Sequence, residues 1–143
     1  MIVVVDAGVS IKWFFPASAE EQDTEQAVSV LRQVQSGQVT LVQPAHWLPE
    51  VVAVITRIRP EIAELAIDYL SAMEVKAQQD TDILKTASRL SQQFSHHLFD
   101  TLYHALAIHL NAVFVTADEK YYRKAETMGC IQLLSDWRYS RLG

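Results

Sequence analysis

The chain has 143 residues, half of them hydrophobic and a fifth charged, and its 12 basic and 17 acidic residues give a formal charge of −5. A chain of this length is expected to form a single domain spanning residues 1–143. Four glycines, four prolines and one cysteine, Cys130, exclude a disordered chain, an internal disulfide framework and a multi-cysteine zinc site. No apolar run approaches the ~20 residues of a membrane span, so we expect a cytoplasmic protein. Taken alone, the negative charge argues against a nucleic-acid partner.

The first part of the chain alternates bare apolar runs with amphipathic segments. Runs of β-branched residues without polar alternation are typical of strands that are covered on both faces of a parallel sheet. Proline and glycine mark the places where helices end. The expected elements are a strand at Ile2–Val5, a short helix at Val9–Phe15, a helix from Ser18 to about Gln35, a strand at Val39–Val42 and a helix from His46 to Arg59.

The second part continues the same alternation. The expected elements are a helix at Glu61–Met73 behind Pro60, a weak strand at Val75–Gln78, a helix from Asp80 or Thr81 to about Phe94, a helix from Asp100 to Leu110, a strand at Ala112–Thr116, a helix from Thr116 or Asp118 to Met128 and a short strand at Cys130–Leu134. Strands that alternate with helices predict an α/β fold, with a central and mostly parallel sheet of about five strands between two helical layers.

Four acidic residues are placed to meet at one end of this sheet. Asp6 ends the first strand, and Asp118 lies just past the strand that ends at Thr116. Asp100 opens the helix that precedes that strand, and Glu50 lies in the first turns of the helix that follows the second strand. Because ligands bind beyond the carboxyl ends of parallel strands, the four carboxylates mark the expected site.

Each of these acids also has a purely structural explanation. Asp6, Asp100 and Asp118 can act as helix caps, and Glu50 can be a rim carboxylate that reaches solvent. Together, however, four neighbouring carboxylates raise one another's pKa, and a hard divalent cation such as Mg²⁺ or Mn²⁺ removes the conflict. A cation site of this kind neutralises a phosphodiester and activates a water, which predicts a metal-dependent nuclease.

The four acids lie in segments that resemble a known family. Val4–Phe14 places an Asp after an apolar strand and before Lys-Trp, and Pro44–Val51 places a proline before a helix that carries a Glu. Phe99–Ala107 contains Asp-Thr-Leu-Tyr followed by Ala-Leu-Ala, and Val115–Asp118 contains Thr-x-Asp. In this order the segments resemble the PIN domain family, and within it the VapC-like ribonuclease toxins of bacterial and archaeal toxin–antitoxin pairs.

The resemblance implies a three-layer α/β/α PIN-like domain with a Mg²⁺- or Mn²⁺-dependent endoribonuclease activity. The family's metal-binding and catalytic acids carry over to Asp6, Glu50, Asp100 and Asp118, and Thr116 resembles a hydroxyl that holds the acidic cluster. The implied partners are an RNA substrate, a cognate antitoxin protein and a second copy of the chain in a homodimer.

Two positions depart from the family pattern. Gly8 stands where the family often has Ser, and Ala53 stands where it often has Asn. These departures point to weaker metal affinity or weaker phosphate contact. They also keep open the alternative of a non-catalytic PIN-like module that binds RNA or protein. A receiver-like phosphoacceptor domain is disfavoured because Asp6 has no acidic neighbour.

Three further residues are candidates for contacts around the acids. His104 follows Asp100 by one helical turn, in range of the cluster or of the substrate. Lys120 and Lys124 lie four apart on one helix after Asp118, where they can hold the RNA backbone. If the four acids bind cations, 13 acidic residues remain against 12 basic ones, so the negative charge no longer argues against RNA.

Overall fold

The computed structural model describes residues 1–15 and 23–138 of the chain. Its centre is a five-stranded sheet in the order β3-β2-β1-β4-β5, and every pair of neighbouring strands is parallel. The strands are β1 (Ile2–Val5), β2 (Thr40–Gln43), β3 (Lys76–Ala77), β4 (Val113–Thr116) and β5 (Ile131–Leu133). The predicted α/β class with a parallel central sheet is confirmed.

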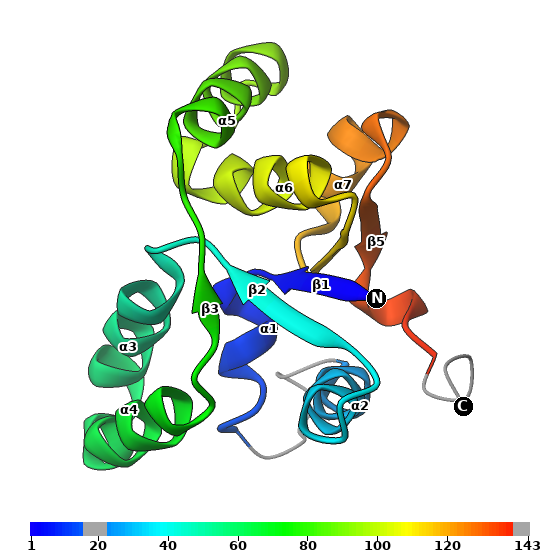
Figure 1. The fold of residues 1–143 in the computed structure, drawn as a ribbon. Helices are drawn as coiled ribbons and strands as arrows, with labels where there is room; N and C mark the ends of the chain where they lie inside the picture. The colour runs from blue at the N-terminus through cyan, green and yellow to red at the C-terminus, as the bar shows by residue number, and fades with distance from the viewer. Residues whose placement is uncertain (16–22, 139–143) are drawn as a thin grey trace.

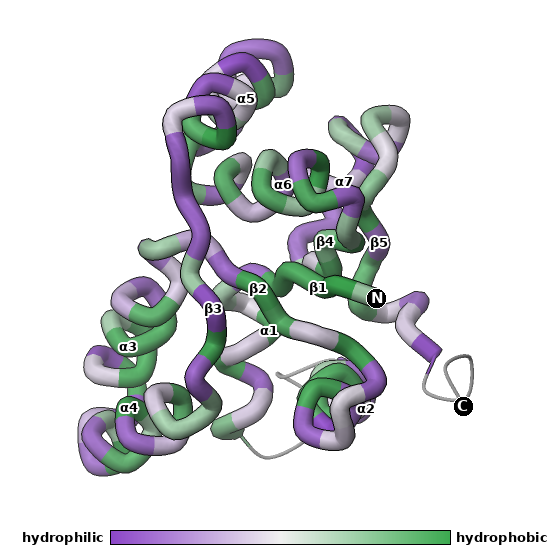
Figure 2. Tube along the Cα trace, viewed as in Figure 1, coloured by the Kyte–Doolittle hydropathy of each residue, from purple (hydrophilic) through white to green (hydrophobic). Residues whose placement is uncertain are grey.

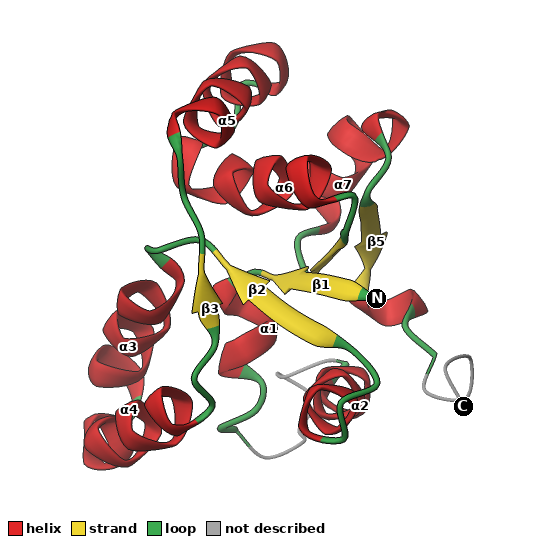
Figure 3. Cartoon of the chain, viewed as in Figure 1, coloured by secondary structure: helices red, strands yellow, loops and turns green. Residues whose placement is uncertain are grey.

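Helices cover both faces of the sheet. They are α1 (Ala7–Ile11), α2 (Thr24–Gln35), α3 (Trp47–Ile58), α4 (Ala63–Ala72), α5 (Thr81–Phe94), α6 (Leu98–Leu110) and α7 (Glu119–Ala125), with short 3₁₀ turns η1 (Pro60–Ile62), η2 (Glu126–Met128) and η3 (Leu134–Asp136). In the view of Figure 1, α5, α6 and α7 lie above the sheet, whereas α1 to α4 lie below it. Figure 3 shows the same three layers by element type.

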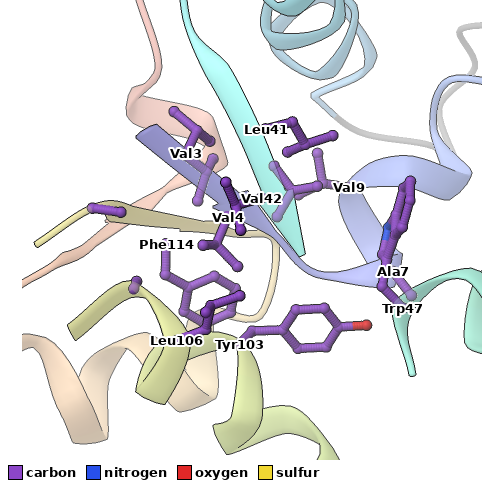
Figure 4. Close-up of a cluster of buried hydrophobic side chains, with 14 of the residues drawn as sticks. Val3, Val4, Ala7, Val9, Leu41, Val42, Trp47, Tyr103, Leu106 and Phe114 are labelled. Carbon is purple, nitrogen blue, oxygen red and sulfur yellow. The ribbon is translucent and has the colours of Figure 1, made fainter. Parts of the chain in front are cut away.

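The core is built on the two central strands. Val3, Val4 and Val5 of β1 are completely buried, as are Val115 of β4 and Tyr103 of α6. Figure 4 shows side chains of β1 and β2 beside Tyr103, Leu106 and Phe114, with Trp47 next to Ala7. In Figure 2, β1 and much of α6 are coloured as hydrophobic, whereas α5 contains many hydrophilic residues. Burial on both faces explains why the strand sequences lack polar alternation.

Gln43 fixes the carboxyl end of β1 in an unusual way. Its side chain lies fully inside the protein and forms two hydrogen bonds to Val5. The Val5 N–H donates to Gln43 Oε1 over 2.9 Å, and Gln43 Nε2 donates to the Val5 carbonyl over 2.7 Å. The Gln43 side-chain amide therefore pairs with the Val5 backbone as a neighbouring strand would. Val5 is the residue directly before Asp6.

Several predicted boundaries differ from the structure. The helix expected from Glu61 is divided into η1 and α4, since Pro60 begins a 3₁₀ turn that tightens the entry. The expected strand at Val75–Gln78 is only two residues long, and both residues are exposed at the sheet edge. The start expected at Ser18 lies outside the described residues. α2 begins at Thr24 after Asp23, whose φ of 62° is left-handed.

The helix expected to open at Asp100 begins two residues earlier. α6 starts at Leu98, and its N-cap is His97, which makes no side-chain capping hydrogen bond. Asp100 therefore lies in the first turn and does not cap the helix. Ser95, with a left-handed φ of 51°, ends α5 and turns the chain sharply toward α6.

The residues that the structure describes contain no helix long and apolar enough to cross a membrane.

Candidate metal centre

The four predicted acids line one open pocket of about 300 Å³ at the carboxyl edge of the sheet. The lining residues are Asp6, Gly8, Glu50, Asp100, Phe114, Thr116, Ala117, Asp118 and Tyr121. The acids come from the end of β1, the first turns of α3 and α6, and the start of α7. The structure thus brings together residues that are separated by more than a hundred positions in the sequence.

Asp6 is held on both carboxylate oxygens. Its Oδ1 accepts a hydrogen bond from the Val9 N–H over 3.0 Å and so caps α1. Its Oδ2 accepts a short hydrogen bond from the Thr116 hydroxyl at the end of β4. Val5 of β1 pairs with Val115 of the neighbouring strand β4. This register brings together the residues that come next in the chain, Asp6 and Thr116.

Thr116 also fixes the next acid in the pocket. Its Oγ1 accepts a hydrogen bond from the Asp118 N–H over 3.0 Å. Asp118 in turn caps α7 by accepting from the Tyr121 N–H over 3.0 Å. One buried hydroxyl thereby links two carboxylates of the pocket.

Glu50 lines the same pocket, beside a histidine that the sequence did not single out. The side chains of Glu50 and His46 are 33% and 16% exposed, and His46 Nε2 lies 3.4 Å from Glu50 Oε2. The imidazole also packs against the rings of Phe99 and Tyr103. Burial lowers the pKa of His46, which favours the neutral ring.

The electrostatics of the pocket disfavour four free carboxylates. Burial raises the pKa of Asp6 from 3.8 to about 6, against the hydrogen bonds from Thr116 and Val9. Burial, together with repulsion from Asp100 and Asp6, raises the pKa of Glu50 from 4.5 to about 7. The protein therefore holds these carboxylates where their charge is unfavourable without a compensating positive charge.

His96 is a residue of this site that the sequence interpretation missed. Its Nε2 lies 3.3 Å from Asp100 Oδ2 and 3.4 Å from Asp118 Oδ2. The ring packs against Tyr121, with centroids 4.8 Å apart. A histidine four residues before an acid occurs twice here, at His46–Glu50 and His96–Asp100, and this spacing was the available signal.

His104 does not face the pocket. It is completely buried, with Nδ1 2.7 Å from the Tyr121 hydroxyl and Nε2 2.8 Å from the Gly129 carbonyl. Of the two expected roles, contact with the substrate does not fit this burial, whereas an indirect role through Tyr121 agrees with it. Its helical spacing from Asp100 turns the ring toward α7, where it positions Tyr121, which does line the pocket.

A second hollow, of about 580 Å³, adjoins the acidic pocket. Lys120 and Lys124 line it, together with Ser91, Ser95, His96, His97 and Leu98. His96 therefore lies between the acidic pocket and a surface that carries two cationic side chains.

Of the two departures from the family pattern, one lies in the pocket. A Cβ added at Gly8 would lie 3.3 Å from Asp6 Oδ1, so a side chain there would crowd this carboxylate. Ala53 is exposed and does not line the acidic pocket.

The donor set fits a divalent cation. It offers carboxylate oxygens, which are the preferred protein ligands of Mg²⁺ and Mn²⁺. His96 Nε2 is a buried ring nitrogen with no hydrogen-bond partner among the described residues. Buried polar atoms without a hydrogen bond are rare in folded proteins, and a bound ion is one explanation for them.

Comparison with known proteins agrees with the geometry. The sequence profile of the PIN domain matches residues 3–127, which include all four acids. No curated protein sequence matches the chain. PIN domains are generally nucleases with divalent metals at such acidic sites. On the profile match, the chain belongs to the PIN domain family.

Proposed function

We propose that this protein is a Mg²⁺- or Mn²⁺-dependent endoribonuclease that hydrolyses RNA phosphodiester bonds. The observation that carries the proposal is the pocket in which Asp6, Glu50, Asp100 and Asp118 converge. The raised pKa values of Asp6 and Glu50 support it, because a bound cation would relieve the repulsion that contributes to them. Caps alone would not require Glu50, which caps no helix.

The four carboxylates would hold the cation, and Thr116 would keep Asp6 and Asp118 in register. A divalent cation bound here supplies charge neutralisation of the phosphodiester, an activated water and stabilisation of the leaving oxygen. Glu50, whose partly exposed side chain lines the pocket, would be placed to accept a proton from the attacking water.

Lys120 and Lys124 would bind the RNA backbone next to the cleavage site. The hollow they line adjoins the acids through His96. Lysine ammonium groups bind phosphate as point charges and need no base contact. This local positive surface explains how a chain with a formal charge of −5 can bind RNA.

The biological setting that fits this activity is that of a toxin inhibited by a cognate antitoxin, with the nuclease acting as a homodimer. The resemblance of the four motifs to the VapC-like toxins is one support for this proposal. A second is an apolar pocket of about 350 Å³ lined by Trp13, Phe14, Leu31, Ile62, Leu65, Ala66 and Tyr69. Leu65 is 72% exposed there, and amphipathic partner helices bind such surfaces.

RNA cleavage tests the proposed activity. Total RNA is incubated with the wild-type protein in Mg²⁺ or Mn²⁺, with and without a chelator. We expect discrete cleavage products that disappear with chelator. Asp6→Asn should lose most of the cleavage, by about 100-fold or more, because it removes a charge that the cation needs.

The matched control is Asp82→Asn, which makes the same chemical change at an exposed position on α5 and should cleave at the wild-type rate. Cleavage that persists in chelator, or that Asp6→Asn leaves unchanged, would refute the proposal. RNA binding without cleavage by the wild-type protein in either metal would favour the non-catalytic module instead.

A further inference from the structure

His96 is held rigidly between two acids of the pocket. Its backbone is anchored on both sides, because the His96 N–H donates to the Ser91 carbonyl over 3.1 Å and the Ser91 hydroxyl donates to the His96 carbonyl. The ring packs on Tyr121, and the side chain is only 11% exposed. A buried, anchored imidazole is oriented in advance for whatever its nitrogen binds.

His96 lies at ion-pair distance from two acids of the pocket. The His96 Nε2 is buried and lies within 3.4 Å of carboxylate oxygens on Asp100 and Asp118. Nevertheless, it makes no hydrogen bond with any described residue. The two separations, 3.3 and 3.4 Å, are longer than the usual N–H···O hydrogen bond of about 2.7–3.2 Å. The nitrogen is therefore close to both carboxylates without a hydrogen bond to either.

The spacing of these atoms matches ligands that share one ion. One ligand atom each from His96, Asp100 and Asp118 lies within 4.8 Å of the other two. Ligands at about 2.0–2.2 Å from an ion lie about 3–4 Å from one another. The two distances from His96 Nε2, 3.3 and 3.4 Å, fall in that range.

We propose that His96 is a direct nitrogen ligand, through Nε2, of a divalent cation held between Asp100 and Asp118. This inference rests on the proposed function and deepens it, because it assigns a mixed nitrogen and oxygen ligand set to one side of the pocket. Imidazole favours first-row transition ions, whereas Mg²⁺ strongly prefers oxygen ligands. The consequence is a site that selects Mn²⁺ over Mg²⁺.

The test compares Mn²⁺ and Mg²⁺ affinities by calorimetric titration of wild type, His96→Ala and His97→Ala. His97 is adjacent but exposed and lies near no carboxylate among the ion pairs of the described residues, so His97→Ala is the matched control. We expect His96→Ala to raise the Kd for Mn²⁺ by about 10–100-fold and the Kd for Mg²⁺ by less than about threefold. His97→Ala should change neither affinity.

Two further measurements keep the test independent of activity and of folding. His96→Gln preserves side-chain bulk but removes the ring nitrogen, so it should lose more affinity for Mn²⁺ than for Mg²⁺. Pulsed electron paramagnetic resonance of the Mn²⁺-bound protein should show a directly coordinated ¹⁴N in wild type and in His97→Ala. The coupling should be lost in His96→Ala, which excludes His46 as its source.

Equal Mn²⁺ affinity in wild type and His96→Ala, or a ¹⁴N coupling that survives in His96→Ala, would overturn the inference. If RNA cleavage also remains metal-dependent and sensitive to Asp6→Asn, only the role of His96 is refuted. If the wild type neither binds metal nor cleaves RNA, the proposed function fails as well.

Discussion

At the scale of single residues, capping and site roles coincide. Asp6 and Asp118 accept hydrogen bonds from the N–H groups of α1 and α7 and still line the acidic pocket. A helix cap fixes a carboxylate in one orientation, which is also what a cation ligand requires. The structural and functional explanations of these residues are therefore not alternatives. Asp100, which caps nothing, and Glu50 complete the set.

The raised pKa values predict how stability depends on pH in the absence of metal. The folded protein retains protons on Asp6 up to about pH 6 and on Glu50 up to about pH 7. The unfolded chain releases them at lower pH. The folded state thus binds more protons, and the free energy of unfolding falls as pH rises through this range. Above it, the full destabilisation is present.

Urea denaturation without metal checks this sign. The double variant Asp6→Asn, Glu50→Gln cannot ionise at these positions, and Asn caps helices as well as Asp. Relative to this variant, we expect the wild type to lose about 1–3 kcal/mol of stability between about pH 5 and about pH 8. Parallel pH profiles of the two proteins would show that the carboxylates are not destabilised by the fold.

The sequence predicts those candidate site residues that lie in recognisable local motifs. It does not predict a residue whose place in the site depends on a turn. Asp6, Glu50, Asp100 and Asp118 each follow a recognisable strand or helix start. His96 reaches them because Ser95 adopts a left-handed φ of 51° and α6 then packs beside α7. The four-residue spacing between His96 and Asp100 was the only signal in the sequence, and it does not reveal the turn or the packing that brings His96 to the acids.

At the scale of elements, β1 carries the site because its end is fixed from both sides. On one side, Thr116 of β4 binds Asp6, and on the other side the Gln43 side chain binds Val5. Both contacts follow from parallel neighbours of the central strand. The position of the first carboxylate thus depends on β2 and β4 as much as on β1.

Gln43 gives a prediction for this arrangement. Gln43→Leu keeps a similar volume but leaves the Val5 N–H and carbonyl without their partner inside the core. We expect a loss of about 2–4 kcal/mol in the free energy of unfolding, because each unsatisfied buried group costs about 1–3 kcal/mol. Chemical denaturation measures the loss.

The control for this change is Gln38→Leu, at an exposed position before β2, which should stay within about 0.5 kcal/mol of wild type. Equal stability of the two variants would mean that the Gln43 side chain does not support the end of β1.

Strands were more predictable than helix ends. The bare apolar runs located β1 and β4 within a residue, since burial on both faces leaves no other explanation for them. Helix boundaries were displaced where 3₁₀ turns intervene, at η1 and η2, because these turns use the same residue types as the helices they extend.

At the scale of the whole molecule, the sheet order explains how distant segments meet. β1 lies at the centre, and the chain first adds β2 and β3 on one side and then β4 and β5 on the other. The sequence predicts parallel strands but contains no local signal for this order. The switch of direction at β1 places Asp6 where the two halves of the fold diverge, which is where open parallel sheets bind ligands.

The formal charge of −5 is also a property of the whole molecule with a local origin. Four acids share one pocket, and two of them have raised pKa values. A divalent cation in that pocket would offset much of the excess negative charge. The molecule therefore stores unfavourable electrostatic energy at the site, and binding of the cation should release it as stability.

The central claim is that these acids form a cation site, and thermal unfolding of wild type and Asp6→Asn at about pH 8, with and without Mn²⁺, tests it most directly. Without metal, Asp6→Asn should be the more stable protein, since it lacks a destabilised carboxylate and keeps the cap. With Mn²⁺ at about 100 times its Kd, the wild type should gain about 2.7 kcal/mol, and Asp6→Asn should gain far less. An Asp6→Asn protein that is less stable without metal and gains as much from Mn²⁺ as the wild type would contradict the account.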